Sequence, residues 1–545
     1  MLLISNIFLL LVNAVTSRRE YTILFNRVAI FILLYSGIIG HGSLYVTCLD
    51  TGIGIYNGLF HSTAITHSFD LFIYIIAPII LLLTGFYARR IVQPIISYNR
   101  FESKNGLFSK GYVKAYRNAV MGIDAPQFTI LEYPLIILFI LIGAILLMSS
   151  SDLVSMFLAI ELQSYGLYIF ATLYRNSEWS TSAGLTYFLL GGLSSCFILL
   201  GSALLYANCG LTSLDGIYVF YNIEMPSAFG EPISTIYSFG AKPEILSMGF
   251  LIMSVGYLFK VSAAPFHFWS PDVYDALDTV VTTFVANLPK ISILIFLLGT
   301  VQHGSQNITE FSWTNVFLVS SFLSLVVGTV GGLVQFRIKK LVTYSTISHV
   351  GFLLLALSIN SVESIQAFIL YLSQYMLTNI NVFFIIILIG YSLQNKGINS
   401  NLLDREHSPL QLISQLKGYF FHNPMLSLSF AITIFSLAGI PPLLGFFAKQ
   451  LVLSAALNNG YVFLSLIGIL TSVIGAVYYL MLIKAMFFEK SDSSLKEQNL
   501  GVSTVPSSPF TITISVLTLI NLLFILYPNI WLSSANILAT IFLNI

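Results

Sequence analysis

The sequence predicts an all-α polytopic membrane protein with about fourteen transmembrane helices. Of the 545 residues, 56% are hydrophobic and 9% are charged, whereas about a quarter of the residues in soluble globular proteins are charged. Apolar runs of roughly 20 residues recur along the chain, and an α-helix of that length crosses about 30 Å of hydrocarbon. A transmembrane β-barrel would instead show shorter segments that alternate between apolar and polar residues.

The apolar windows divide nearly the whole chain into candidate spans. They are Leu2–Val15, Arg27–Val46, Leu71–Tyr87, Pro134–Ser150, Leu153–Leu173, Ser182–Tyr206, Ile245–Ala264, Leu277–Val301, Trp313–Val334, Leu341–Ile359, Ile365–Ile389, Met425–Phe447, Tyr461–Phe487 and Phe510–Leu532. The first window has no basic residue ahead of it, so we expect a retained span rather than a targeting signal. An even number of spans places both termini on the same side of the membrane.

The distribution of basic residues agrees with this division. Lys and Arg concentrate in the loops on the side from which a membrane protein is inserted. Twenty of the 24 Lys and Arg residues fall in alternate loops, and Lys242 falls in the opposite set. The other three, Lys260, Lys290 and Lys449, lie inside predicted helices.

Loops and cysteines indicate which functions the chain does not carry. Ala88–Tyr133 is basic and Ala207–Glu244 is acidic, so we expect these long loops on opposite faces. Neither contains a Gly-rich phosphate-binding loop, and we expect no nucleotide site and no nucleic-acid partner. Cys48, Cys196 and Cys209 form no CxxC pair, which argues against an iron–sulfur cluster or a zinc site. We therefore expect no metal and no cofactor bound by this chain.

Four ionisable residues stand inside predicted spans, namely Glu161, Lys260, Lys290 and Lys449. Each ionised side chain at the centre of a bilayer costs about 2.5 to 3.5 kcal/mol, so we expect each to have a function. Lysine releases its proton readily when it is desolvated, whereas arginine keeps its proton. We interpret the four residues as proton-exchanging groups, with Glu161 and Lys260 as a pair. The alternative for Glu161 is a carboxylate that fixes helix packing through hydrogen bonds.

Glu161 begins a polar stripe on an otherwise apolar helix. In LAIELQSYGLYIF, polar residues follow Glu161 at steps of three or four positions. They are Ser164, Tyr165, Tyr168 and Thr172. Such residues share one helix face.

Predicted helix breaks stand close to two of the lysines inside spans. Proline removes a backbone donor and breaks or kinks a helix, and the freed carbonyl groups can bind ions or water. We predict helix breaks at Pro265, five residues after Lys260, and at Pro441 and Pro442, ahead of Lys449. The alternative is that the lysines extend along the helix to the membrane surface.

Lys290 and the histidines complete the set of candidates. Lys290 follows Pro289 directly and shares a helix face with Thr283. His349 is the best neutral relay, because imidazole exchanges protons near physiological pH, although a hydrogen-bonded core histidine is the alternative. His267 is expected near the membrane interface. The remaining histidines are assigned to loops or edges: His41, His61, His67, His303, His407 and His422.

The segments that carry these residues resemble, in order, the antiporter-like subunits of respiratory NADH:quinone oxidoreductase (complex I). The motifs are LAIELQSYGLY with Glu161, KVSAAPFHFWSPDVYDA with Lys260, NLPKISIL with Lys290, RIKKLVTYSTISHVGF with His349, and AGIPPLLGFFAKQ with Lys449. They cover more than half of the chain. Within the family, PFHFWSPDVYD and a lysine after the second break resemble the subunit 2 branch.

The resemblance implies two inverted five-helix repeats, each with one broken helix. It divides the chain into N-terminal helices with a basic loop (1–132), a first repeat (133–302), a second repeat (313–487) and a C-terminal helix (509–545). It also implies a mid-membrane chain for protons, linked by internal water. The residues of that chain are Glu161, Lys260, Lys290, His349 and Lys449.

The implied function is that of a proton-translocating membrane-arm subunit, coupled to electron transfer from NADH to quinone in other subunits. The implied partners are other membrane-arm subunits, membrane lipids, protons and internal water. The expected location is the mitochondrial inner membrane, with the bacterial plasma membrane as the alternative. Two other functions stay open, a self-standing cation/proton antiporter and a structural scaffold, whereas quinone binding is disfavoured because no distinctive polar head-group site stands out.

Overall fold

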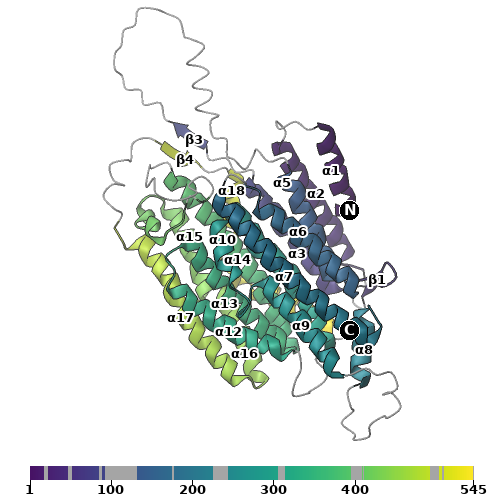
Figure 1. Cartoon of the computed structure of the whole chain (residues 1–545). Helices are drawn as coiled ribbons and strands as arrows, with labels where there is room; N and C mark the ends of the chain where they lie inside the picture. Colours follow the sequence, from purple (N-terminus) through teal and green to yellow (C-terminus); the bar gives the residue numbers. More distant parts are fainter. Residues whose placement is uncertain are drawn as a thin grey trace, which may run out of the picture.

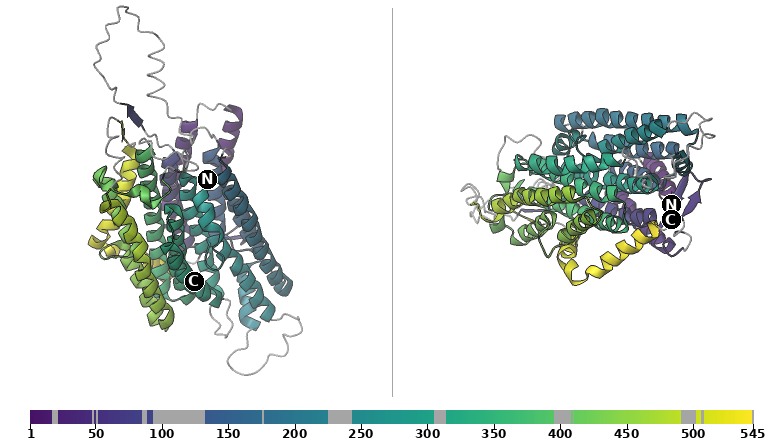
Figure 2. Two further views of the ribbon diagram at one scale, coloured as in Figure 1. Left: turned by 60° about the vertical axis from the view of Figure 1, so that its left-hand side comes forward. Right: turned by 90° about the horizontal axis from the view of Figure 1, so that it is seen from below.

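The computed structural model forms one bundle of helices that lie side by side (Figures 1 and 2). It describes residues 1–16, 22–46, 49, 52–84, 89–92, 132–174, 177–224, 243–304, 314–394, 408, 410–490, 502–505 and 508–543. Every predicted apolar window contains a helix. Ten of the described helices are long and apolar enough to span a membrane.

Three helices and a β-hairpin precede the first repeat. They are α1 (Leu2–Thr16), α2 (Thr22–Ser43), β1 (Ile53–Ile55), β2 (Phe60–Ser62) and α3 (Ala64–Thr84). The window predicted for α3 began at Leu71, and this start is wrong. The Thr63 hydroxyl accepts a hydrogen bond from the Thr66 amide at 3.3 Å, which is an N-cap contact that lets the helix begin earlier. His67 and Asp70 consequently lie within α3 rather than in a loop or at its edge.

Two repeats of five spans follow, as predicted. The first contains α5 (Tyr133–Ser149), α6 (Leu153–Ala171), α7 (Glu178–Cys209), α9 (Pro243–Val261) with α10 (Trp269–Ala276), and α11 (Thr279–Gly304). The second contains α12 (Asn315–Leu333), α13 (Ile338–Ile359), α14 (Val362–Gln394), α15 (Pro424–Ala438) with α16 (Leu444–Asn458), and α17 (Val462–Phe487). Because five is odd, the second repeat enters the bundle in the opposite direction to the first. Each repeat has one helix in two parts.

The first two helices of each repeat make the same close contact. A Cβ atom added to Gly143 on α5 would lie 2.7 Å from the backbone nitrogen of Gln163 on α6. A Cβ atom added to Gly328 on α12 would lie 2.6 Å from the backbone nitrogen of Ser348 on α13. Glycine thus permits the helix backbones to approach at equivalent places, and the contact positions α6 and α13, which carry candidate residues.

The C-terminal span differs from its prediction. The predicted window Phe510–Leu532 is divided into α18 (Ser508–Leu523) and α19 (Pro528–Leu543). Pro528 has no amide hydrogen with which to continue α18, but it fits the first turn of a new helix. Gln366 on α14 donates to the Leu532 carbonyl at 3.2 Å, and Gln302 on α11 donates to the carbonyl of Phe542. These bonds hold α19 against α14 and α11 at one edge of the bundle (Figure 2, right).

Two short strands and a helix lie where loops were predicted. β3 (Arg89–Val92) pairs antiparallel with β4 (Val502–Val505) and joins the start of the basic loop to the segment before α18. The acidic loop contains α8 (Leu214–Glu224), which lies at the end of the bundle opposite β3 and β4 (Figure 1). Residues 93–131 and 225–242, the rest of the two long loops, fall outside the described residues.

Candidate functional site

Glu161 and Lys260 face each other between α6 and α9. Lys260 Nζ lies 3.6 Å from Glu161 Oε1, and the two side chains are 8% and 14% exposed. The hydroxyl of Ser195 on α7 donates to the same carboxylate, and Lys260 Nζ donates to Ser164 Oγ at 2.6 Å. The structure therefore forms the expected pair, and Lys260 does not extend to the membrane surface.

The polar stripe of α6 points inward in part only. Ser164 contacts Lys260, whereas Tyr165 is 55% exposed. At 3.6 residues per turn, positions three and four residues from Glu161 are rotated to opposite sides of it. Glu161 therefore lies at the edge of the internal face, with Ser164 on the inner side and Tyr165 on the outer side.

A small cavity adjoins Lys260 next to α11. The volume that the centre of a water molecule can reach is about 20 Å³, which is enough for one water. Gln163, Lys260 and Pro289 are among its lining residues. Gln163 Nε2 donates to Ser292 Oγ at 3.0 Å, and this bond links α6 to the helix that carries Lys290. The cavity is therefore a place where water can stand between the first two lysines.

Lys290 is buried between α11 and α13, with 1% of its surface exposed. Its Nζ donates to Thr346 Oγ1 at 3.3 Å and lies 5.8 Å from the centre of the Tyr274 ring. Among the described residues, it makes no ion pair with a carboxylate. The alternative in which Lys290 extends to the surface is wrong, and neutral oxygen and aromatic groups surround its ammonium.

His349 stands at the centre of a group of tyrosines. Its Nδ1 lies 2.7 Å from Tyr371 OH and its Nε2 lies 3.2 Å from Tyr479 OH. Tyr375 stacks on the imidazole at a centroid distance of 5.1 Å. Each ring nitrogen therefore has a hydroxyl with which it can share a proton, and those hydroxyls come from α14 and α17.

The two helix breaks are capped in different ways. Lys449 Nζ donates to the carbonyl oxygens of Leu437 and Ala438, both at 2.9 Å, at the end of α15. At the first break, Trp269 Nε1 donates to Phe259 O at 3.0 Å. The breaks lie beside Pro265 and beside Pro441 and Pro442, as predicted. The freed carbonyls of the second break bind a lysine of the chain itself, but those of the first do not bind Lys260.

One stripe of α13 connects Lys290 to Lys449. Thr346, His349 and Phe352 are three residues apart and so share one helix face. Thr346 binds Lys290, and Phe352 presents its ring 5.8 Å from Lys449 Nζ. All five candidate residues thus belong to one polar file that crosses the bundle from α6 and α9 to α13 and α16 (Figure 1).

Several residues of the file were not found from the sequence. Tyr371, Tyr375 and Asn379 recur every four residues on α14, a spacing that could have indicated a polar face. Asn379 Nδ2 donates to Asn287 Oδ1 at 2.8 Å, which joins α14 to α11. The sequence did not indicate Ser195 as a site residue, because serine is common on the outer faces of these helices as well.

Lys339 was assigned to a loop but is 2% exposed at the start of α13. Its Nζ donates to the Leu277 carbonyl at 2.5 Å and to Ser408 Oγ at 2.6 Å. The sequence RIKK does not distinguish it from its neighbours Arg337 and Lys340. Those two form ion pairs with aspartates nearer the surface, at 2.5 and 2.8 Å.

Comparisons with known proteins agree with this architecture. The family model described as NADH:quinone oxidoreductase/Mrp antiporter, transmembrane, matches residues 150–475. NADH-ubiquinone oxidoreductase chain 2 of Rhizopus oryzae is 46% identical over 557 aligned residues, which cover 99% of each chain.

Solved structures show the same fold at lower sequence identity. A chain of respiratory complex I from Thermus thermophilus aligns over 98% of this chain and 97% of its own length, with a TM-score of 0.66 and 24% identity. A chain of the Mrp complex from Dietzia sp. aligns over 100% and 97%, with a TM-score of 0.71 and 16% identity.

Proposed function

Because the chain belongs to the NADH:quinone oxidoreductase/Mrp antiporter family of membrane subunits, we propose that it is a proton-translocating membrane-arm subunit of respiratory NADH:ubiquinone oxidoreductase. The observation that carries the proposal is the file of three buried lysines that spans both repeats. A helix bundle needs no such file for packing alone, since each buried charge costs about 2.5 to 3.5 kcal/mol. A path for protons requires it.

In this proposal, the proton moves between amines through hydroxyl groups and water. Lys260 holds a proton while Glu161 and Ser164 solvate its ammonium. Water in the adjoining cavity bridges toward α11, where Lys290 is the next acceptor. From Thr346 the path continues through His349 to Lys449.

The free energies of the hydrogen bonds in the proposed path are similar in size to the free energy of moving a proton through the membrane potential. A hydrogen bond to a charged group is worth about 1.5 to 3 kcal/mol, and moving one charge through 100 mV changes the free energy by about 2.3 kcal/mol. Making or losing one such bond, for example between Lys260 and Ser164, is therefore enough to retain or release a proton against the membrane potential. Coupling requires only small side-chain movements.

The partners in this proposal are the other membrane-arm subunits, together with lipids, internal water and protons. Electron transfer from NADH to quinone takes place in other subunits, and this chain binds no cofactor. We place the chain in the mitochondrial inner membrane, because its relative at 46% identity is a eukaryotic NADH-ubiquinone oxidoreductase chain.

Replacing lysines at the two ends of the file tests the proposal. We expect Lys260→Ala and Lys449→Ala each to reduce proton translocation on the order of a hundredfold, because a positioned proton-transfer group contributes about 10² to 10⁴ in rate. Proton uptake should be measured in vesicles at matched content of the assembled complex. Lys417→Ala is the control, since Lys417 is a half-exposed lysine that pairs with Glu489 at 3.3 Å.

The same measurements separate the other two functions. A scaffold predicts less assembled complex but an unchanged proton yield per complex for Lys260→Ala. A self-standing antiporter predicts cation/proton exchange in vesicles that contain this chain alone. Unchanged proton yield in both lysine variants contradicts the proposal.

The Thr346 hydroxyl provides a finer test of the path. Thr346→Val keeps the shape of the side chain but removes the acceptor for Lys290 Nζ. We expect turnover coupled to translocation to fall on the order of tenfold, since a hydrogen bond to a charged group is worth about 1.5 to 3 kcal/mol. Thr346→Ser, which keeps the hydroxyl, should retain most of the rate, and equal rates for the two variants would remove Thr346 from the path.

A further inference from the structure

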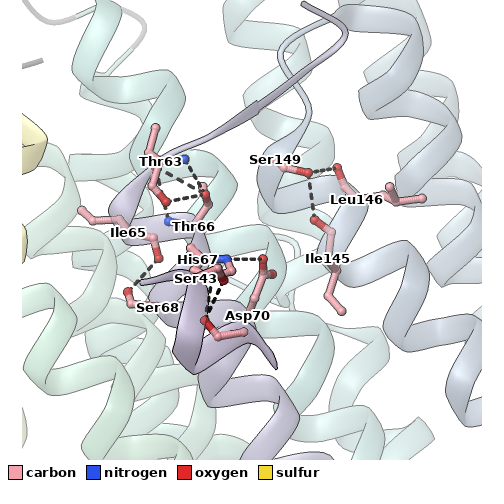
Figure 3. A network of polar contacts seen from close by, with 11 residues as sticks. Ser43, Thr63, Ile65, Thr66, His67, Ser68, Asp70, Ile145, Leu146 and Ser149 are labelled. Carbon is pink, nitrogen blue, oxygen red and sulfur yellow. Dashed lines mark hydrogen bonds and ion pairs between the residues drawn. The ribbon is translucent and has the colours of Figure 1, made fainter. Parts of the chain in front are cut away.

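A second group of titratable side chains lies outside both repeats, between α2 and α3 (Figure 3). His67 Nδ1 lies 3.9 Å from Asp70 Oδ2, and the two side chains are 17% and 13% exposed. Both residues stand in the first two turns of α3, among apolar helices. The proposed proton file does not use this pair.

The contacts of the imidazole determine which nitrogen carries hydrogen. His67 Nε2 lies 3.0 Å from the Gly40 carbonyl and 2.5 Å from Ser43 Oγ. A carbonyl oxygen can only accept, so Nε2 donates to it and bears a hydrogen. Ser43 Oγ donates to the same carbonyl at 2.7 Å. Nδ1 is therefore the ring nitrogen left to face Asp70.

Asp70 needs a proton or a cation close to it. Its Oδ1 atom is inaccessible to solvent and has no hydrogen-bond partner among the described residues. An ionised carboxylate in such surroundings is strongly disfavoured unless a charge compensates it. Two states of the pair satisfy this condition: Asp70 as a neutral acid, and ionised Asp70 beside protonated His67. Each of them holds one proton more than ionised Asp70 beside neutral His67.

Few other charges can compensate Asp70. The helices packed on α3 are α2, α5, α11, α18 and α19, and α18 and α19 contain no titratable residue. On α3 itself, Tyr74 stands one turn after Asp70. The titratable residues on the other three helices are Arg27, Tyr35 and His41 on α2, Tyr133 on α5, Lys290 on α11, and His303, whose side chain lies outside the described residues.

None of these groups supplies the missing charge. Arg27, Tyr35 and His41 are exposed on α2. Tyr133 begins α5 at the far end of the bundle, and Lys290 belongs to the file. His67 is therefore the partner that the described residues offer to Asp70.

A pocket of about 310 Å³ lies beside the start of α3, close to this pair. Its walls include Thr63 and Thr66 at the start of α3, and Asp215 on α8. Thr66 stands one helical turn before Asp70 on the same face, so about one turn of α3 separates the wall of the pocket from the carboxyl group. Toward the file, α11 presents the buried apolar residues 293–298, which separate the pocket from Lys290.

We propose that His67 and Asp70 form a proton-binding site that is separate from the lysine file and that exchanges its proton through this pocket. The compartment it samples is the one at the α8 end of the bundle, opposite the end where Arg337 and Lys417 lie. The occupancy of the site follows the acidity of that compartment. The proposal holds whether or not the lysine file translocates protons.

Infrared spectroscopy of the assembled complex in vesicles tests the site directly. We expect a carbonyl band of a protonated carboxyl group that titrates with pH and is lost in Asp70→Asn. In His67→Gln, the pH midpoint of the Asp70 carbonyl band should shift by about one pH unit or more, because Asp70 has lost its charged partner. Asp272→Asn, which alters an exposed acid that does not line the pocket, is the matched control and should keep both the band and its midpoint.

Three results would overturn the proposal. The first is an Asp70→Asn spectrum identical to that of the unaltered complex across the titration. The second is an unchanged midpoint in His67→Gln, which also serves as the test if Asp70→Asn does not assemble. The third is a midpoint that follows the pH of the compartment at the β3 end when the two sides of the vesicle are buffered separately.

Discussion

Replacing Lys290 by alanine is expected to abolish measurable proton translocation while leaving the outer ends of the file in place. Lys290 is the central amine, and its Nζ reaches Thr346 on the second repeat. Without it, the proton must cross from the cavity beside Lys260 to His349 with no amine between them. A loss on the order of a hundredfold or more follows from the contribution of one positioned proton-transfer group, and vesicle acidification per assembled complex measures it.

Lys290→Arg distinguishes proton transfer from a need for positive charge. Arginine keeps its proton at any accessible pH, so it preserves the charge but stops the relay. We expect Lys290→Arg to be as inactive as Lys290→Ala at equal complex content. Substantial proton yield in the arginine variant would show that a fixed charge is sufficient, and it would contradict a relay through Lys290.

Gly328→Ala is expected to reduce the amount of assembled complex strongly. The added Cβ atom would lie 2.6 Å from the backbone nitrogen of Ser348, closer than packed atoms approach, so α12 and α13 must separate. Overpacking of this kind costs about 1 to 3 kcal/mol, occasionally more, and it displaces the helix that carries Thr346 and His349. The amount of complex and its thermal unfolding temperature report the effect.

Gly192→Ala is the matched control for this change. Gly192 also lies within a helix, α7, but a Cβ atom there would meet nothing within 4 Å. Alanine favours a helix by about 1 kcal/mol over glycine, so this variant should be at least as stable as the unaltered chain. Equal losses in the two variants would show that the contact between α12 and α13 does not limit assembly.

Most of the architecture could be predicted from apolar periodicity and from the positions of proline. Spans are long and uniform because lipid requires every backbone polar group to be satisfied within the helix. Errors occurred where a capping residue or a single proline sets a boundary. Thr63 starts α3 a full turn and more before its apolar window, and Pro528 starts a helix where the apolar run continues without a change in composition.

The candidate site was predictable in its charged members and much less so in its neutral ones. Lys260 and Lys290 were recognisable because charge is rare and costly in a span. Tyr371 and Tyr479 were not, because tyrosine is common throughout this chain, and only the packing of α14 and α17 against His349 distinguishes them. The pair His67 and Asp70 was missed because its helix was predicted to begin too late.

The unlike caps of the two broken helices make the two halves of a symmetric fold respond differently to charge. The indole of Trp269, which binds the end of α9, keeps its hydrogen at every pH in the cell. The strength of this contact therefore does not depend on pH. At the α15 end, the hydrogen bonds of Lys449 weaken when its amine becomes neutral, because charge-assisted bonds are about twice as strong. In the proposed relay, the contact between the end of α15 and Lys449 on α16 therefore weakens whenever this amine passes its proton on, whereas the contact that holds the end of α9 keeps its strength.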